Sequence, residues 1–307
     1  MSNDAAAAPV EGSSLNPAML GPDFLCIGMA KAGTAWLYDQ TQYHPDFWMP
    51  WLKEVAYLKR PANFVERARA ALARVERKRR KNKPTSARSR PMDDPQLDFL
   101  RDAVALGDAP MDIARYAALF RHKGELLSGD ITPAYSDLPE STIAALATSL
   151  PELRVLFLVR DPVERLWSHL NMVARKEKLK AGVLDRPRVL QRLLRSKGMA
   201  GFASCPMQVA RRWREAAPGL AFKSVLFDDI VSRPAEMRAE IFSYIGADAS
   251  RASGELSASH NRKAGTTKLD MTDSVRAVLV ERYAAEIRAC AETFGGAARE
   301  WPKRYGL

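Results

Sequence analysis

The feature that most constrains the fold of this chain is the run Arg154-Val155-Leu156-Phe157-Leu158-Val159. Its side chains are apolar on both faces of a strand, which is typical of an interior strand in a parallel sheet that helices cover. Asp161-Pro162 follows and predicts the start of a helix, because proline suits a first helical turn. The run therefore predicts a strand with a helix directly behind it, the repeating unit of an α/β fold.

Two other parts of the chain repeat this pattern. Phe24 to Ile27 is a short apolar run that ends at the turn residue Gly28, and Thr34 to Tyr43 follows as a predicted helix. Lys223 to Phe227 predicts another buried strand, which leads into a helix from about Pro234 to Ile245. Alternating strands and helices predict a central parallel sheet flanked by helices.

The length of 307 residues, with 47% hydrophobic side chains, predicts one domain over residues 21–307. We expect a helical insertion at about 62–125, with a basic helix from Phe64 to Lys83, a loop from Pro84 to Pro95 and further helix to Phe120. Residues 1–20 have no periodicity and predict a disordered tail. A closing amphipathic helix is predicted from Asp273 to Phe294 by the spacing of Val275, Leu279, Tyr283, Ile287 and Cys290.

The charge of the chain is concentrated in one stretch. The net charge is +11, and residues 67–90 hold eleven Lys and Arg against the single acid Glu76. Such concentration indicates a local feature and argues against nucleic acid as the main partner. A polyanion-binding module built on this stretch is one alternative function, and the stretch can equally serve to attract an anionic acceptor, an acidic partner or membrane headgroups.

The cysteines and the apolar segments bear on location. Cys26, Cys205 and Cys290 are odd in number and lack metal-type spacing, which predicts a reducing compartment and no metal site. No signal-peptide pattern and no apolar run of roughly 18 residues, the length of a membrane span, occurs in the sequence. We therefore expect a cytoplasmic protein without a transmembrane segment.

Gly28-Met29-Ala30-Lys31-Ala32-Gly33-Thr34 leaves a predicted strand and opens a predicted helix. Its backbone amides and the helix N-terminus can face a phosphate, the small residues allow close approach, and Lys31 and Thr34 add a charge and a donor. The lysine stands two residues before Gly33, whereas the Walker A pattern places it directly after the second glycine. This displacement argues against an ordinary nucleotide triphosphatase, although a plain tight turn or a P-loop kinase remains an alternative.

The segment from Lys31 to Leu37 resembles the 5′-phosphosulfate loop of the sulfotransferases that use 3′-phosphoadenylyl sulfate (PAPS). The family's second signature, an Arg-(Asp or Asn)-Pro after a strand with a serine eight residues beyond the arginine, is matched by Arg160 and Ser168. His44-Pro45 and the segment from Lys53 to Leu58 resemble the carbohydrate and tyrosylprotein branches, and Gly129 to Tyr135 is similar to a loop of heparan-sulfate-type members. The segment 226–246 resembles the late strand and helix of the fold, and the carbohydrate, tyrosylprotein and bacterial branches are closest overall. The resemblance spans roughly residues 22 to 270 and implies the P-loop NTPase-like sulfotransferase fold.

The resemblance also implies the donor site and the chemistry. The donor-binding residues would be Lys31, Ala32, Gly33, Thr34, Ala35, Trp36, Arg160, Ser168, Arg262 and Lys263. Lys31 would stabilise the leaving phosphate, and Glu54, which stands ahead of an aromatic pair in its block, would be the general base for an acceptor hydroxyl or amine. PAPS would be the co-substrate, with no metal.

Several of these assignments have an alternative in which the residue has only a structural role. Glu54 as a surface carboxylate, Arg160 as part of a salt-bridged helix cap and Trp36 as a buried aromatic would look the same in sequence. Thr132 and Tyr135 are candidate substrate residues, because their block resembles a Thr-Pro-x-Tyr loop. Where many heparan-sulfate-type members have a lysine before this Thr-Pro, the chain has Ile131, and none of its four histidines clearly matches the base of the small-molecule branch.

Overall fold

A computed structural model describes residues 20–81, 92–179, 182–195, 204–252 and 269–307 of the chain. Its centre is a parallel sheet of four strands in the order β2-β1-β3-β4. The strands are β1 (Phe24–Cys26), β2 (Gly129–Ile131), β3 (Arg154–Val159) and β4 (Phe222–Leu226). Phe24 pairs with Gly129 on one side and with Arg154 on the other, so β1 and β3 are interior strands. The predicted parallel α/β sheet is confirmed.

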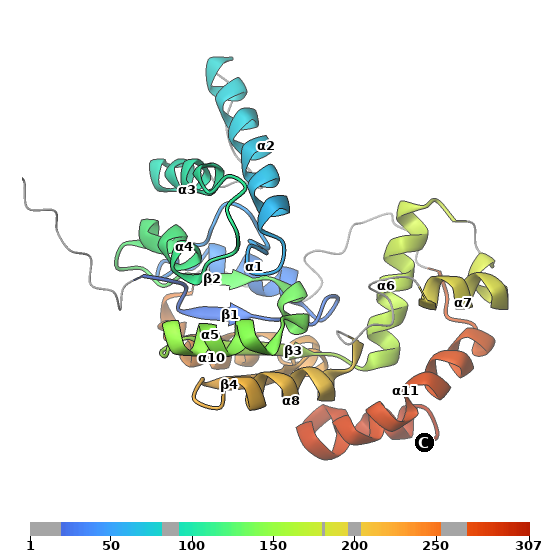
Figure 1. Ribbon diagram of the computed structural model, residues 1–307. Coiled ribbons are helices and arrows are strands. Elements are labelled where there is room, and N and C mark those ends of the chain that lie inside the picture. Colours follow the sequence, from blue (N-terminus) through green and yellow to red (C-terminus); the bar gives the residue numbers. More distant parts are fainter. Residues whose placement is uncertain (1–19, 82–91, 180–181, 196–203, 253–268) are drawn as a thin grey trace, which may run out of the picture.

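Helices cover both faces of this sheet. In Figure 1, α5 and α8 lie in front of the strands, and α1 and α10 lie behind them. The α-helices are α1 (Thr34–Gln42), α2 (Pro61–Arg80), α3 (Asp94–Ala105), α4 (Ile113–Ala118), α5 (Glu140–Ser149), α6 (Pro162–Lys176), α7 (Pro187–Arg195), α8 (Pro206–Ala216), α9 (Phe227–Ser232), α10 (Pro234–Ile245), α11 (Asp273–Phe294) and α12 (Glu300–Arg304). Short 3₁₀ helices are η2 (Leu119–Lys123), η3 (Pro133–Asp137), η4 (Val183–Asp185), η6 (Ala249–Arg251) and η7 (Gly296–Arg299).

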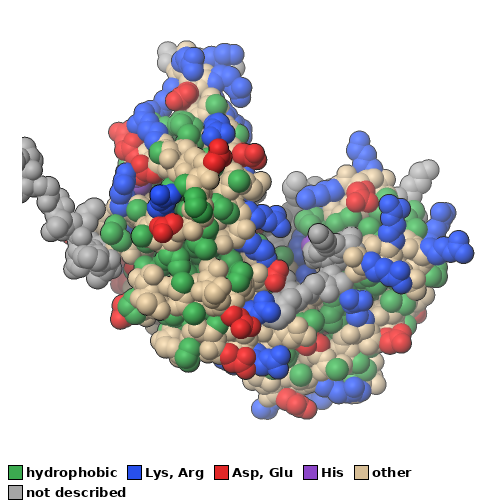
Figure 2. Space-filling model, in the orientation of Figure 1, with side chains coloured by type: hydrophobic (Ala, Val, Ile, Leu, Met, Phe, Trp, Pro, Cys, Tyr) green, Lys and Arg blue, Asp and Glu red, His purple; other side chains and the backbone are tan. Residues whose placement is uncertain are grey.

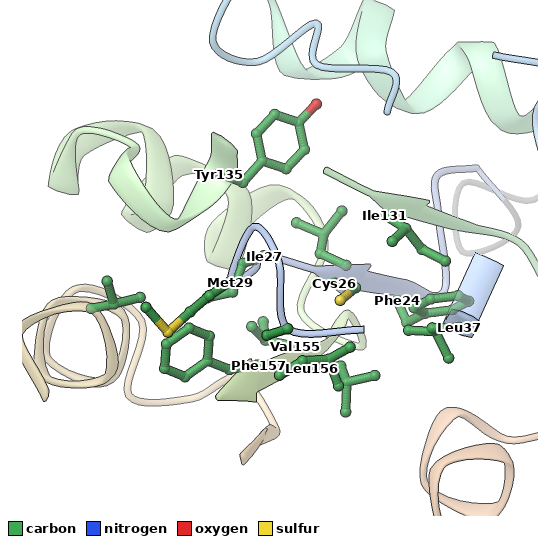
Figure 3. Packing of buried hydrophobic residues seen from close by; sticks show 14 of the residues in the cluster. Phe24, Cys26, Ile27, Met29, Leu37, Ile131, Tyr135, Val155, Leu156 and Phe157 are labelled. Carbon is green, nitrogen blue, oxygen red and sulfur yellow. The ribbon is translucent and has the colours of Figure 1, made fainter. Parts of the chain in front are cut away.

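The sheet forms the centre of the hydrophobic core. Every residue of β1 is fully buried, and the side chains of β3 from Val155 to Val159 are buried as well. Figure 3 shows β1 residues packed with residues of β3 and with Met29 from the loop after β1, while the hydroxyl of Tyr135 is directed away from this cluster. Burial on both faces explains why the strand of β3 lacks the polar alternation of a half-exposed strand.

The helices α2 and α3 form an arm that extends from the sheet (Figure 1). Phe64, Val65 and Ala68 are the buried stripe of α2, and Leu97 and Leu100 belong to the buried stripe of α3. The predicted basic helix therefore exists, although it begins at Pro61 and ends at Arg80. In the described parts of the chain, no helix is long and apolar enough to cross a membrane.

The C-terminal helices pack against α6 on the far side of the sheet from this arm. The apolar residues that predicted α11 are all buried, which confirms this helix and its inward face. The helix α12 is tied to the start of α6 through Asp161, which accepts hydrogen bonds from Arg304 Nη1 at 3.0 Å and from the Tyr305 hydroxyl at 2.8 Å. A second bond joins Arg304 Nη2 to Asp228 at 3.1 Å.

Candidate functional site

The loop after β1 lies at the carboxyl edge of the sheet, where ligands gather in open α/β folds. Its backbone is tied to β3, because the Met29 amide donates to the Leu158 carbonyl at 2.5 Å and the Leu158 amide donates to the Gly28 carbonyl at 2.7 Å. Lys31 and Gly33 both have positive φ angles, of 75° and 98°. The chain therefore turns sharply between β1 and α1, as the turn residue Gly28 after the apolar run predicted.

The N-terminus of α1 suits an anion. Gly33 caps the helix in a left-handed conformation and, as a glycine, has no side chain to bond the amides of the first turn. The amides of a first helical turn and the helix dipole favour a phosphate group at this position. A Cβ atom on Gly33 would lie 3.1 Å from the ring of Phe227, so close packing as well as the φ angle requires glycine. Ala32 and Thr34 are buried beside it.

Arg160 joins this loop to the end of β3. Its Nη1 atom donates to the carbonyl of Lys31 at 3.0 Å, and its guanidinium lies over the Phe227 ring at 4.7 Å from the centroid. Glu164, one turn into α6, is 3.5 Å from Nη2. Burial lowers the pKa of Arg160 from its usual value, and nearby acids, Glu164 first, act against this shift. The two predicted phosphate-binding segments are thus in direct contact.

The helix α6 begins as predicted. Asp161 is its N-cap and accepts hydrogen bonds from the amides of Val163 and Glu164 at 2.9 and 3.3 Å. Ser168 follows Glu164 by four residues, so the two side chains share one face of α6. Because Arg160 reaches Glu164, Ser168 lies one turn beyond the guanidinium on that same face.

His169, on α6, is one of the four histidines for which the sequence predicted no catalytic role. Its Nδ1 atom is buried without a hydrogen-bond partner among the described residues. Burial, together with the positive charges of Arg165, Lys31 and Lys176, lowers the pKa of His169 to about 4. The imidazole is therefore neutral at neutral pH, and the interior side of α6 beside Lys31 is electropositive. Figure 2 shows Lys and Arg side chains along both walls of the hollow between the α2–α3 arm and the lobe of α6 and α7.

Glu54 is exposed, in a turn beside the end of β2 whose next four residues, Val55 to Leu58, are buried. Its φ angle is 60°, and Ala56 has a φ angle of 59°. Lys53, its neighbour, lies over the ring of Tyr38 in α1, with Nζ 5.8 Å from the centroid. The turn is bonded to β2, because the Val55 amide donates to Asp130 at 3.2 Å. Glu54 is therefore at the same edge of the sheet as the phosphate loop, with its side chain open to solvent.

Asp130 and Tyr116 form a buried polar cluster that the sequence reasoning missed. Asp130 accepts hydrogen bonds from Thr132 Oγ1 at 2.5 Å and from the Tyr116 hydroxyl at 3.1 Å. Burial raises the pKa of Asp130 to about 6, and these hydrogen bonds limit the rise. A charged residue inside a three-residue strand gives no apolar pattern, so the only sequence signal was its place in the Gly129–Tyr135 block.

Burial also bears on the roles predicted for Thr132, Tyr135 and Trp36. Thr132 and Tyr135 are fully buried, and their hydroxyls accept hydrogen bonds from the amides of Ala56 and Leu58. This burial does not fit direct contact with an acceptor. Trp36 belongs to the hydrophobic core with 4% of its surface exposed, as expected for the buried-aromatic alternative, and its part in donor binding stays a prediction. Arg262 and Lys263 lie outside the described residues.

The sequence also matches a family model. The model described as "Sulfotransferase family" matches residues 22–251, which include the phosphate loop, Glu54, Arg160 and Ser168. This chain belongs to the sulfotransferase family. Its match covers well over half of the chain, so the activity class of sulfuryl transfer follows from membership.

Solved sulfotransferase structures are similar to this chain, and one of them shares its fold with a TM-score above 0.5. A sulfotransferase from Alicyclobacillus acidocaldarius is 16% identical, with a TM-score of 0.56 over 91% of this chain and 98% of its own. The sulfotransferase domain of the Synechococcus PCC 7002 olefin synthase is 15% identical, with a TM-score of 0.46 over 86% of this chain and 95% of that domain. No curated protein sequence matches this sulfotransferase. The first similarity supports the P-loop-like sulfotransferase fold that the resemblance implied.

Proposed function

We propose that this enzyme transfers the sulfuryl group of PAPS to a hydroxyl or amine of an acceptor. The observation that carries the proposal is the 3.0 Å hydrogen bond from Arg160 to the carbonyl of Lys31. It brings an arginine fork beside a loop that suits a phosphate, so one ligand with two phosphate groups can contact both. PAPS has a 3′-phosphate and a 5′-phosphosulfate, whereas ATP carries all of its phosphates at one end.

The residues of the site fit the donor. The first turn of α1 and the Gly33 conformation suit the 5′-phosphosulfate, together with Lys31 and the Thr34 hydroxyl. Arg160 and Ser168 would take the 3′-phosphate from the start of α6. Arg160 already contacts Glu164 at 3.5 Å, so donor binding would exchange part of this ion pair for a phosphate contact.

The chemistry that these residues would perform is placement and charge neutralisation. In-line transfer moves negative charge onto the leaving 5′-phosphate, and the Lys31 ammonium would stabilise that charge. The acceptor must lose a proton as it attacks the sulfur atom, and Glu54 would receive this proton. The exposed position of Glu54 at the sheet edge supports this role, because an acceptor can approach it from solvent.

Two other functions are less well supported. A kinase-like enzyme would use the same loop, but the lysine is displaced from the Walker A position and Arg160 adds a second anion contact. A polyanion-binding module would use the basic stretch 67–90, of which the described part lies on α2. The family match favours an enzyme, and the stretch can then assist binding of an anionic acceptor.

The test is transfer of ³⁵S from labelled PAPS into a small-molecule cell extract. Glu54→Gln should lower the rate by about 100-fold, within the range of general base catalysis, while PAP, the desulfated donor product, binds unchanged. Lys31→Ala should lower both the rate and PAP affinity. Glu66→Gln, an exposed glutamate on α2, is the control and should transfer normally. A folded Glu54→Gln variant with the normal rate would refute the mechanism.

A further inference from the structure

The turn that carries Glu54 has a backbone conformation that needs external support. Glu54 and Ala56 have φ angles of 60° and 59°, in the left-handed region that residues with a Cβ atom rarely adopt. Two such residues in one turn persist only where surrounding groups hold them. The contacts of this turn therefore identify the side chains that fix the position of the proposed base.

One set of contacts comes from the end of β2 and from η3. The amides of Val55, Ala56 and Leu58 donate to side chains of this segment. Their acceptors are Asp130 Oδ1 at 3.2 Å, Thr132 Oγ1 at 3.2 Å and the Tyr135 hydroxyl at 3.4 Å. Thr132 also donates to Asp130, and Tyr116 donates to the other carboxylate oxygen. The amide side of the turn is thus fixed to a buried network in the core.

A second set of contacts, to the backbone carbonyls of the turn, comes from α2. Arg67 Nη1 donates to the Glu54 carbonyl at 2.6 Å, and Nη2 donates to the Lys53 carbonyl at 2.7 Å. A planar guanidinium can bond two neighbouring carbonyls at once, which an ammonium group cannot match with the same fixed geometry. Phe64, Val65 and Ala68 pack the root of α2 into the core, so the clamp has a rigid base.

We propose that Arg67 is a positioning residue for sulfuryl transfer, which clamps the Glu54 turn from α2 opposite the network of Asp130, Thr132 and Tyr135. This inference rests on the proposed function, because it assumes that Glu54 is the base. The first half of the basic helix α2 would then contribute to the reaction through a specific contact, and not through its positive charge alone. It also gives Thr132 and Tyr135 a supporting role in place of contact with the acceptor.

The expected effect follows from the accuracy that proton transfer demands. A base acts only within hydrogen-bond reach of the proton it removes, and a displacement of about 1 Å can lower a rate by about 100-fold. Loss of the Arg67 clamp should release the carbonyl side of the turn, while the β2 side keeps it near its place. The rate should fall while the phosphate loop and Arg160, which bond other segments, keep their affinity for PAP.

Hydrogen–deuterium exchange tests the clamp without an acceptor. In the full-length protein, Arg67→Ala should speed exchange of peptides covering residues 51–60 by roughly tenfold, because the turn opens more often. Peptides covering β3 should exchange as in the wild type. Arg69→Ala, an exposed arginine on the same helix, is the matched control and should change neither region. Unchanged exchange of residues 51–60 in Arg67→Ala would overturn the clamp.

A double-mutant cycle tests the link to Glu54. With ³⁵S-PAPS and the same extract, Arg67→Ala should lower the rate by roughly 10- to 100-fold and Arg67→Lys by less, with PAP affinity unchanged. In a Glu54→Gln background, Arg67→Ala should have almost no further effect, because a residue that acts through Glu54 loses its role with it. Equal loss in both backgrounds would show a merely structural role and overturn the inference.

The proposed function and this inference can fail separately. If Glu54→Gln transfers at the wild-type rate, the proposed base is wrong and the positioning role falls with it. If Glu54→Gln is inactive while Arg67→Ala matches the Arg69→Ala control, the proposed function stands and the inference alone is refuted.

Discussion

Two aspartates show how single residues hold this site. Asp130 and Asp161 are almost completely buried, and burial raises the pKa of each carboxyl above its usual value. Both are surrounded by donors: Asp130 by hydroxyls and the Val55 amide, and Asp161 by the first amides of α6, by Arg304 and by Tyr305. Buried carboxylates are tolerated when such donors replace water. Burial of each carboxyl lowers the stability of the fold, but its hydrogen bonds fix a neighbouring segment: the Glu54 turn for Asp130 and the start of α6 for Asp161.

Asp130 should give the protein a distinctive pH dependence of stability. An unfolded aspartate has a pKa near 3.9, and that of folded Asp130 is about 6. Between these values the folded state holds a proton that the unfolded state has lost, so the free energy of unfolding should fall as pH rises from about 4 to 6, by about 2 to 3 kcal/mol. Above pH 6 this contribution is constant.

The measurement is urea unfolding of the wild type and Asp130→Asn between pH 4 and 7.5. Subtracting the two curves isolates the contribution of this carboxyl, and the wild type should lose more stability than the variant as pH rises. Glu66→Gln, which alters an exposed carboxyl, should leave the slope unchanged. Parallel curves for the wild type and Asp130→Asn would contradict the assignment.

At the scale of elements, local sequence patterns predicted strands and helices, whereas features that depend on contacts between distant segments were not predicted. The strand β3 and the helices α10 and α11 have the bounds that the apolar runs, prolines and periodicity predicted. The strand β2 was missed, because Gly129-Asp130-Ile131 is short and holds a charge whose partners come from distant segments. The contact of Arg67 with Glu54 crosses thirteen residues and involves only backbone carbonyls, for which the sequence has no pattern.

The short helix α12 should stabilise the start of α6. Arg304 bonds Asp161 and Asp228, and Tyr305 also donates to Asp161. Arg304→Met keeps much of the apolar stem but leaves the buried Asp161 carboxylate with fewer donors, which should lower the free energy of unfolding by about 1 to 3 kcal/mol. Because Asp161 follows Arg160, PAP affinity should fall as well.

Chemical denaturation and calorimetry with PAP check this prediction. Lys303→Met, which removes an exposed ion pair with Glu300 on the same helix, is the control and should change stability by less than about 0.5 kcal/mol. Arg304→Met would have to match this control in stability for the proposed role of α12 to be wrong.

At the scale of the whole molecule, the sheet brings distant segments together at one edge. The loop after β1 and Arg160 follow the carboxyl ends of β1 and β3, and the Glu54 turn is bonded to β2 through the Val55 amide and Asp130. The α2–α3 arm and the α6–α7 lobe then flank a hollow with basic walls (Figure 2). The sequence predicted the donor side of this site, because its loop and strand end have local patterns. The contacts that hold the Glu54 turn join segments far apart in the sequence, so they could be identified only from the structure.

The central claim is that the enzyme binds a donor with separate 3′- and 5′-phosphate groups. Isothermal titration calorimetry with PAP and with ADP tests it most directly, because the two nucleotides differ mainly in where the second phosphate lies. We predict that the wild type binds PAP at least about tenfold more tightly than ADP, a difference of about 1.4 kcal/mol. Arg160→Ala should abolish this preference. Equal affinity for PAP and ADP in the wild type, or a preference that survives in Arg160→Ala, would contradict the account.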